Sequence, residues 1–153
     1  MTNAEKKVRR SDFFGSHDRL LVGADTIVAL GNMIFGKPAG RNSAERMLRE
    51  LTGKTHRVIT GLCLSGPGTD DQTSTDIRLE SAVSYVTFNT LNDSTIRTYL
   101  SSGEWEGKAG AYAIQGEGRS LVAAFDGDYD NIVGLPLKLL HASISKYFSH
   151  CLL

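Results

Sequence analysis

An aspartate interrupts an apolar run in the first part of the chain. The stretch LLVGADTIVALG, residues 20–31, has the composition of a buried strand except at Asp25 and Thr26. A buried carboxylate without a partner costs several kcal/mol or gives up its charge, so another group must compensate Asp25. The residues alone leave two interpretations open. Either Gly23 to Thr26 form a turn in which Asp25 accepts backbone N–H bonds, or Asp25 lies at a strand end, where it holds a metal ion or deprotonates a water.

A lysine between a glycine and a proline is the second candidate. GNMIFGKP, residues 31–38, matches the first seven positions of a phosphate-binding P-loop, but the eighth must be Ser or Thr to reach Mg²⁺ and here is Pro38. The residues before it also indicate a hairpin rather than a strand, a glycine loop and a helix. Lys37 therefore suits either a phosphate contact or an ordinary solvated loop position.

A glycine-rich stretch, KAGAYAIQGEG at residues 108–118, is the third candidate. Its glycines let backbone N–H groups approach an anion closely, although the third glycine of a dinucleotide-binding fingerprint is missing. The side-chain amide of Gln115 carries donors and an acceptor that could read the edge of a base. A surface connection with Gln115 in solvent is the alternative.

Other reactive side chains give weaker patterns. Cys63 and Cys151 form no CxxC pair, which argues against a structural zinc site or disulfide framework and favours a reducing cytoplasm. Cys63 lies within an apolar stretch, so we expect it in the core. The four histidines have no HxxxH or HExxH spacing. The aspartates of DGDYDN, residues 126–131, lack the glutamate of a calcium loop, because Leu137 occupies that position, and are predicted to be turn residues.

The composition is that of an ordinary globular protein and predicts a single domain over residues 1–153. Seventeen basic residues balance seventeen acidic ones, which argues against a nonspecific nucleic-acid binder. No apolar run approaches the roughly 20 residues of a membrane span, and MTNAEKKVRR is not followed by the apolar stretch of a secretory signal. We therefore expect a cytoplasmic protein that binds neither membrane nor nucleic acid.

Helices and strands intermix along the chain in the predicted order. The helical segments are residues 4–14, a helix capped by Asn42 or Ser43 and stopped by Gly53, a helix capped by Asn92 or Asp93 and ended by Gly103, and a last helix near Pro136. The predicted strands are residues 20–30, 33–35, 55–65, 77–88 and 120–125, with a hairpin turn at 31–32 and an exposed loop at 66–76. This order predicts an α/β or α+β fold with a mixed sheet.

Several of these motifs, taken in order, resemble the Maf family of nucleoside triphosphate pyrophosphatases. The residues that carry the resemblance are GADTIV (23–28), GKP (36–38), AERMLRELTGKTHRVITG (44–61), SGEWEGKAGAYAIQGEG (102–118) and GDYDNIVGLPL (127–137). The resemblance implies an elongated α/β fold, similar to inosine triphosphatase, in which helices flank a mixed sheet. It also implies a cleft for a nucleoside triphosphate and a divalent cation, Mg²⁺ or Mn²⁺. The products would be pyrophosphate and a nucleoside monophosphate.

Family roles transfer to five residues. Asp25 matches the proposed proton acceptor, which favours the second interpretation of that aspartate. Thr26 and Gln115 match positions that influence substrate choice, and Lys37 matches the lysine near the phosphates. Lys7 matches a lysine at the end of the preceding helix. The form AGAYAIQG, residues 109–116, resembles the branch that acts on dTTP and UTP.

The start of the chain departs from the family pattern. Family members open with a strand and a Ser-x-Ser-Pro-Arg-Arg loop that supplies a phosphate-binding arginine, and Arg9 and Arg10 are not preceded by Ser-Pro. We therefore expect a sheet that lacks the first strand, an unpaired edge beside GADTIV, weak activity and association between copies, for which a homodimer is one form. Two functions stay open: a pyrophosphatase of dTTP and UTP, or a shortened, impaired relative that binds nucleotide or acts as a partner in cell division.

Overall fold

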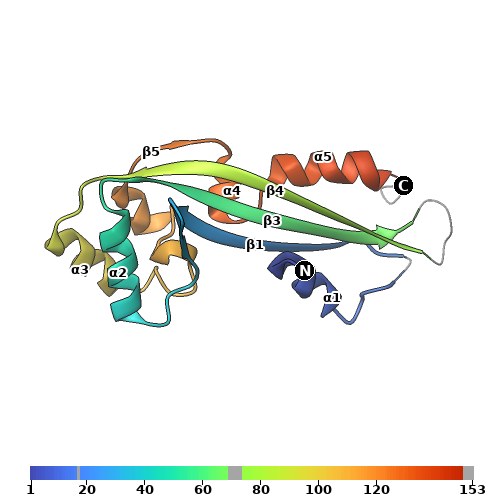
Figure 1. Cartoon of the computed structure of the whole chain (residues 1–153), viewed down its shortest axis with the longest axis horizontal. Helices are drawn as coiled ribbons and strands as arrows, with labels where there is room; N and C mark the ends of the chain where they lie inside the picture. Colours follow the sequence, from blue (N-terminus) through green and yellow to red (C-terminus); the bar gives the residue numbers. More distant parts are fainter. Residues whose placement is uncertain (17, 69–73, 150–153) are drawn as a thin grey trace. The chain divides into compact units, whose positions relative to one another are not determined.

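The computed structural model describes residues 1–16, 18–68 and 74–149 (Figure 1). Its elements are α1 (Asn3–Arg9), β1 (Leu21–Leu30), β2 (Met33–Phe35), α2 (Arg41–Leu51), β3 (Thr55–Pro67), β4 (Thr75–Phe88), α3 (Asp93–Ser102), the 3₁₀ turns η1 (Ala109–Ala111) and η2 (Gly116–Leu121), β5 (Val122–Asp126), α4 (Tyr129–Val133) and α5 (Leu137–Tyr147). The predicted α/β class is confirmed. His17, His150, Cys151 and the middle of the predicted loop 66–76 lie outside the described residues. Among the helices that the structure describes, none combines the length and apolar character needed to cross a membrane.

The five strands form one sheet in the order β2-β1-β3-β4-β5. The predicted hairpin at 31–32 is confirmed, because β1 pairs antiparallel with β2 from Leu30 opposite Met33 to Val28 opposite Phe35. β4 and β5 are also antiparallel, with Tyr85 opposite Asp126. The sheet is antiparallel rather than mixed, because β3 also runs opposite to both of its neighbours, β1 and β4 (Figure 1).

The chain divides into two compact units, each with its own core. Unit 1 comprises Met1–Asp25, Thr60–Ala82 and Gly134–Leu153, and unit 2 comprises Thr26–Ile59 and Val83–Val133. The boundary along β1 falls between Asp25 and Thr26. On the β2 side of β1 the described pairing covers residues 28–30, so an unpaired edge beside the rest of GADTIV stays a prediction.

Unit 1 is built on the alternating side chains of β3. Cys63 contacts Ala4 and Val8 of α1, while Leu62 and Leu64 point to the other face and pack with Phe148 after α5. Figure 1 shows the same arrangement, with α1 and α5 on opposite sides of the strands. Because successive side chains of a strand face opposite ways, one apolar strand serves both helices. The prediction that Cys63 lies in the core is confirmed, and burial raises the pKa of its thiol.

Helix α1 is shorter than predicted. Thr2 caps its start, accepting the N–H of Glu5 at 3.1 Å, and Arg9 rather than Phe14 is its last residue. The chain then turns, because the N–H of Phe14 bonds the carbonyl of Ser11, and the Ser11 hydroxyl accepts the N–H of Phe13. Serine competes for backbone bonds in this way, which ends the helix.

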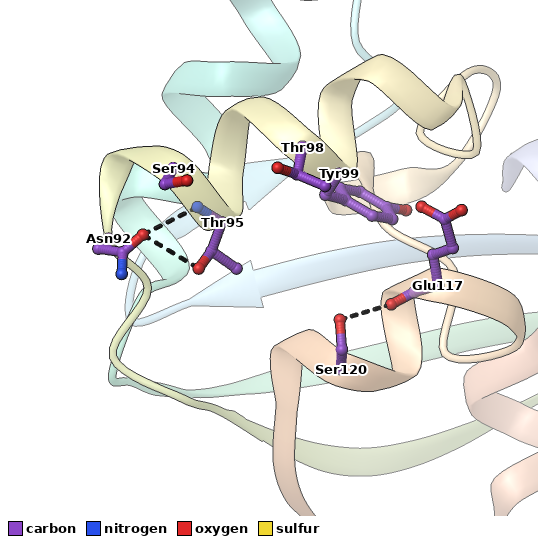
Figure 2. Close-up of a pocket in the computed structure, with 7 residues that line it drawn as sticks. All are labelled: Asn92, Ser94, Thr95, Thr98, Tyr99, Glu117 and Ser120. Carbon is purple, nitrogen blue, oxygen red and sulfur yellow. Dashed lines mark hydrogen bonds between the residues drawn. The ribbon is translucent and has the colours of Figure 1, made fainter.

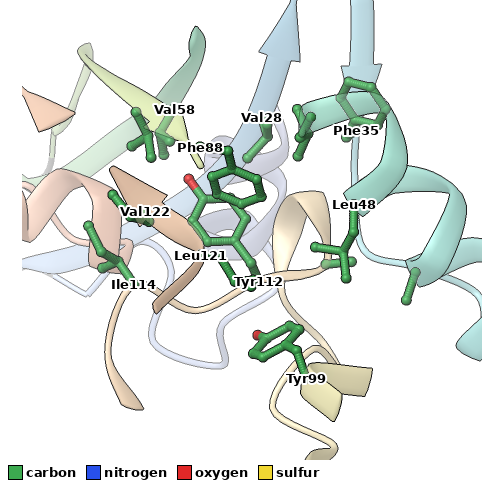
Figure 3. Close-up of a cluster of buried hydrophobic side chains, with 14 of the residues drawn as sticks. Val28, Phe35, Leu48, Val58, Phe88, Tyr99, Tyr112, Ile114, Leu121 and Val122 are labelled. Carbon is green, nitrogen blue, oxygen red and sulfur yellow. The ribbon is translucent and has the colours of Figure 1, made fainter. Parts of the chain in front are cut away.

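Unit 2 places its helices against the apolar face of its part of the sheet (Figure 3). Buried side chains from every element meet in this core, among them Val28, Leu48, Val58, Phe88, Tyr99, Tyr112, Leu121 and Val122. The predicted Asn92 cap is confirmed, since its side chain accepts the N–H of Thr95 at 2.8 Å. Helix α2 begins one residue before the predicted Asn42 cap, with Gly40 at the N-cap and no side-chain capping bond.

The end of unit 2 differs from the prediction in two places. β5 begins at Val122, because Ser120 and Leu121 belong to the 3₁₀ turn η2. The segment DGDYDN contains the start of the short helix α4, so it is only in part a turn. Turn chemistry does precede that helix, where the Asp128 carboxylate accepts the N–H of Asp130 at 3.2 Å.

Candidate active site

Asp25 lies within a continuous strand. β1 runs unbroken from Leu21 to Leu30, so the interpretation of Gly23 to Thr26 as a turn is wrong. The side chain of Asp25 is 23% exposed, and its charge therefore needs partners other than bulk water.

Two side chains of α1 supply those partners. The Lys7 ammonium lies 2.8 Å from Asp25 Oδ1, and Asn3 Nδ2 donates to Asp25 Oδ2 at 3.0 Å. Lys7 also donates to the carbonyl oxygen of Ala24 at 2.6 Å. Asn3 and Lys7 are four residues apart, so one face of the helix presents both donors to the same carboxylate. A cation and an amide thus compensate the charge that the sequence placed inside an apolar run.

Gly23 allows α1 to come this close. A Cβ atom at this position would lie 2.6 Å from the carbonyl oxygen of Ala4 and 2.7 Å from Cγ2 of Val8. Any larger residue would therefore push the helix away from β1, and with it Asn3 and Lys7. The glycine of GADTIV is a packing requirement for the Asp25 cluster, by which we mean Asn3, Lys7 and Asp25.

The remaining predicted residues belong to unit 2. Thr26 follows Asp25 directly on β1, at the first position of unit 2. Lys37 is exposed and follows the β1–β2 hairpin, at a point where the carbonyl of Gly36 accepts the N–H of Gly110 at 3.1 Å. The loop that carries Lys37 is thereby tied to the glycine-rich stretch 108–118.

Gln115 is exposed, at the N-cap of η2. The backbone on both sides of it is held. Before it, the N–H of Ala113 donates to the Tyr99 hydroxyl at 3.1 Å; after it, the N–H groups of Glu117 and Gly118 donate to the two carboxylate oxygens of Glu104 at 3.0 and 3.1 Å. Within the part of the chain that the structure describes, no side-chain or backbone group bonds the Gln115 amide. A fixed backbone therefore carries a side chain with its hydrogen-bonding capacity intact.

The core anchors the same stretch through Tyr112. Its hydroxyl lies 2.8 Å from His56 Nε2, and the rings of His56, Phe88 and Tyr112 pack edge to face. Burial lowers the pKa of His56 to about 4 and raises that of Tyr112. Next to Tyr112, Ala111 has a φ of 60°, a conformation that costs a non-glycine residue on the order of 1–3 kcal/mol and persists only where its surroundings enforce it.

A cavity of about 280 Å³ lies elsewhere in unit 2, between α3 and η2 (Figure 2). Its lining is mostly hydroxyl groups: Asn92, Ser94, Thr95, Thr98, Tyr99, Glu117 and Ser120. Several of these groups already serve the fold. Asn92 accepts from Thr95, and the Ser120 hydroxyl donates to the carbonyl of Glu117. The five predicted site residues do not line it.

The carboxylates of the described residues do not form a ready-made metal cage. Among residues 1–16, 18–68 and 74–149, no three His, Cys, Asp or Glu side chains gather at one point. A protein site that binds Mg²⁺ through one or two carboxylates together with substrate phosphates needs no such gathering. The Asp25 carboxylate has the chemistry of such a ligand.

Comparison with known proteins assigns the family. A family model described as Maf-like protein matches residues 1–147. The chain belongs to the Maf family. Three relatives, from Clostridioides difficile, Pyrococcus furiosus and Brucella abortus, are each named dTTP/UTP pyrophosphatase. They are 43%, 45% and 46% identical to this chain over 87%, 76% and 81% of its length. The alignments cover 66%, 58% and 57% of the relatives' own length, so this Maf chain spans less than two thirds of each.

Sequence reasoning missed two residues of this site. Asn3 shares a helix face with Lys7, and the four-residue spacing was the signal that could have found it. The Glu104 carboxylate bonds the backbone of residues 117 and 118, and no local sequence pattern predicts hydrogen bonds between segments so far apart in sequence.

Proposed function

We propose that this Maf chain hydrolyses dTTP and UTP to the monophosphate and pyrophosphate. The observation that carries the proposal is the Asp25 cluster, a strand-borne carboxylate with a lysine and an amide at 2.8 and 3.0 Å. It stands in the motif GADTIV of a chain whose relatives are named for this activity. The activity and the substrates are proposals for this chain, because it matches only part of the length of those relatives.

Asp25 accepts the proton of the attacking water in this proposal. The water oxygen bonds the α-phosphorus, the bond from that phosphorus to the bridging oxygen breaks, and pyrophosphate leaves with the bond electrons. Each oxygen of a carboxylate can accept more than one hydrogen bond, so the bonds from Asn3 and Lys7 leave Asp25 able to take a proton. Lys7 orients the carboxylate and adds positive charge beside the reacting phosphate.

A divalent cation, Mg²⁺ or Mn²⁺, fits Asp25 together with phosphate oxygens of the substrate. When bound, it would offset the negative charge of the phosphate chain. The dependence on such a cation is a proposal drawn from the donor chemistry of Asp25.

In this proposal, residues of unit 2 recognise the nucleotide. Lys37 contacts the phosphates as a point charge, and the Gln115 amide reads the pyrimidine edge, with Thr26 contributing to substrate choice. Buried, unpaired Cys63 is compatible with the reducing cytoplasm that we propose as the compartment. A homodimer stays a prediction.

The test is a panel of nucleoside triphosphates with the purified chain, with and without Mg²⁺ or Mn²⁺, in water enriched in ¹⁸O. We expect dTTP and UTP to be the best substrates and the label to appear in the monophosphate, because the water attacks the α-phosphorus. Label in the pyrophosphate would contradict that attack. Release of nucleoside diphosphate and phosphate, or no turnover of any nucleotide, would refute the activity.

A further inference from the structure

The loop that carries Gln115 is closed by a carboxylate from the end of α3. Glu104 follows Gly103 directly after that helix, and its own backbone N–H donates to the Ser102 hydroxyl at 3.2 Å. Its two carboxylate oxygens accept the N–H groups of Glu117 and Gly118, one each. A carboxylate that accepts two backbone N–H groups forms charge-assisted bonds, which are about twice as strong as neutral ones.

The backbone around Gln115 is shaped to admit this carboxylate. Gly116 has a φ of +69°, and a Cβ atom there would lie 2.3 Å from Glu104 Oε1. Gly118 packs so closely on the chain before Gln115 that a Cβ atom would lie 1.9 Å from the carbonyl oxygen of Ala113. The two arms of the Gln115 loop, residues 113–118, therefore touch, and only glycine fits at either contact.

The two groups that hold this loop come from α3 and from the residues directly after it. Tyr99 on α3 receives the N–H of Ala113, and Glu104 after α3 receives the N–H groups of residues 117 and 118. Tyr99 is buried, and burial raises its pKa to about 12, so its hydroxyl stays protonated at neutral pH. Glu104 is the one charged group of the pair.

We propose that Glu104 is the positioning residue for base selection: it holds the Gln115 backbone where the side-chain amide reads the pyrimidine. The inference rests on the proposed function, because it needs Gln115 to contact the base. Glu104 itself contacts neither the base nor the phosphates. A site built around hydrogen bonds rejects a ligand that leaves its groups unpaired, so a displaced Gln115 costs discrimination between bases.

The variants are Glu104→Gln, which keeps one acceptor oxygen, and Glu104→Asp, which keeps the charge but is one methylene too short to span both N–H groups. Glu106→Gln is the matched control, since it changes the same charge two residues away, where the structure describes no side-chain bond. The measurement is kcat and KM for dTTP, UTP and the purine nucleotides. Affinity is read in parallel from the fluorescence of Trp105, the only tryptophan of the chain.

We expect the ratio of kcat/KM between dTTP and dATP to fall about tenfold in both Glu104 variants and to stay unchanged in Glu106→Gln. Turnover of dTTP at saturation should stay within about threefold, because the Asp25 cluster is untouched. In a Gln115→Ala background, Glu104→Gln should lower the ratio no further, since the two residues act through one contact. Amide exchange at Glu117 and Gly118 should accelerate in both variants, which shows in each folded protein that the clamp has opened.

Two results would overturn the inference alone: an unchanged base ratio after the two amides lose protection, or an equal loss on every nucleotide. An unsubstituted chain that neither hydrolyses nor binds nucleoside triphosphates would refute the proposed function, and this inference with it.

Discussion

The Asp25 cluster of unit 1 and the Gln115 loop of unit 2 hold their key residues by opposite means. In the cluster, the side chain of Asp25 is engaged by two side chains of a short helix, one of them, Lys7, 54% exposed. In the loop, the backbone is engaged by buried or half-buried groups, and the Gln115 side chain stays available. The difference matches the roles that we propose: a side chain that accepts a proton benefits from partners that can adjust, whereas a side chain that distinguishes bases needs a backbone held in one position.

The largest effect should come from removing the base at Asp25. Asp25→Asn keeps the shape and lowers turnover of dTTP by about 10²–10⁴-fold. Stability should change little, because a partly buried charge is lost together with its ion pair. Steady-state kinetics and thermal unfolding measure both, and Asp18→Asn, at a carboxylate 76% exposed in the same unit, is the control. Full activity of the Asn variant would remove the chemical role from the Asp25 cluster.

The core beneath the Gln115 loop should respond to pH through His56. The unfolded chain takes up a proton near the ordinary value of 6.5, while burial lowers the pKa of the folded form to about 4. Stability is therefore lost as pH falls from 6.5 towards 4, by up to about 3 kcal/mol. Urea unfolding at several pH values should show this slope in the parent and not in His56→Gln.

His141, exposed on α5, provides the control for that experiment. His141→Gln should leave the slope in place. An identical slope in His56→Gln would mean that the ring is not kept neutral by its packing against Phe88 and Tyr112.

A smaller effect is expected where α1 meets β1. Gly23→Ala puts a methyl group against Ala4 and Val8, and overpacking of this kind costs about 1–3 kcal/mol. Turnover should fall as well, because the displaced helix carries Asn3 and Lys7. Gly61→Ala is a matched control on β3, where the nearest atom to the new Cβ is the carbonyl oxygen of Asp25 at 4.0 Å. An equal loss of stability and turnover in the two variants would show that the effect of Gly23→Ala does not arise from displacement of the Asp25 cluster.

The smallest effect concerns recognition. Gln115→Ala removes neutral hydrogen bonds, each contributing about 0.5–1.5 kcal/mol, so discrimination among bases should fall more than turnover of the best substrate. Lys37→Ala should instead weaken the binding of all nucleoside triphosphates equally, since every one carries the same phosphates. Competition between dTTP and dATP in one reaction measures the difference. If Gln115→Ala instead lowered the activity on every nucleotide equally, Gln115 would be assigned to a phosphate contact rather than to the base.

Local patterns predicted the local structure well. Ala44, Leu48 and Leu51 repeat at helical spacing and are buried on α2, and the Asn92 cap and the hairpin at 31–32 follow from turn and capping chemistry. The predicted end of α1 was five residues too late, and the helix α4 was not predicted, because side-chain bonds of serine and aspartate to the backbone decide where such short helices begin and end.

Contacts between distant segments could not be predicted from those patterns. The family resemblance assigned roles to Asp25 and Lys7, but the ion pair between them depends on α1 docking at Gly23. Glu104 reads as a polar loop residue in sequence, and its role in the loop depends on a chain reversal between residues 104 and 117. The antiparallel sheet is likewise a matter of long-range pairing.

The division of the chain into segments has a consequence for protein synthesis. Unit 2 is complete once residue 133 has left the ribosome, whereas unit 1 still lacks the segment that begins at Gly134. Until α5 and Phe148 arrive, Leu62 and Leu64 have only part of their cover on that side of β3, from Leu20 and Ala24. A newly made chain therefore carries a complete unit 2 while an apolar face of β3 still lacks part of its cover, and we expect chaperones to bind the chain during this interval.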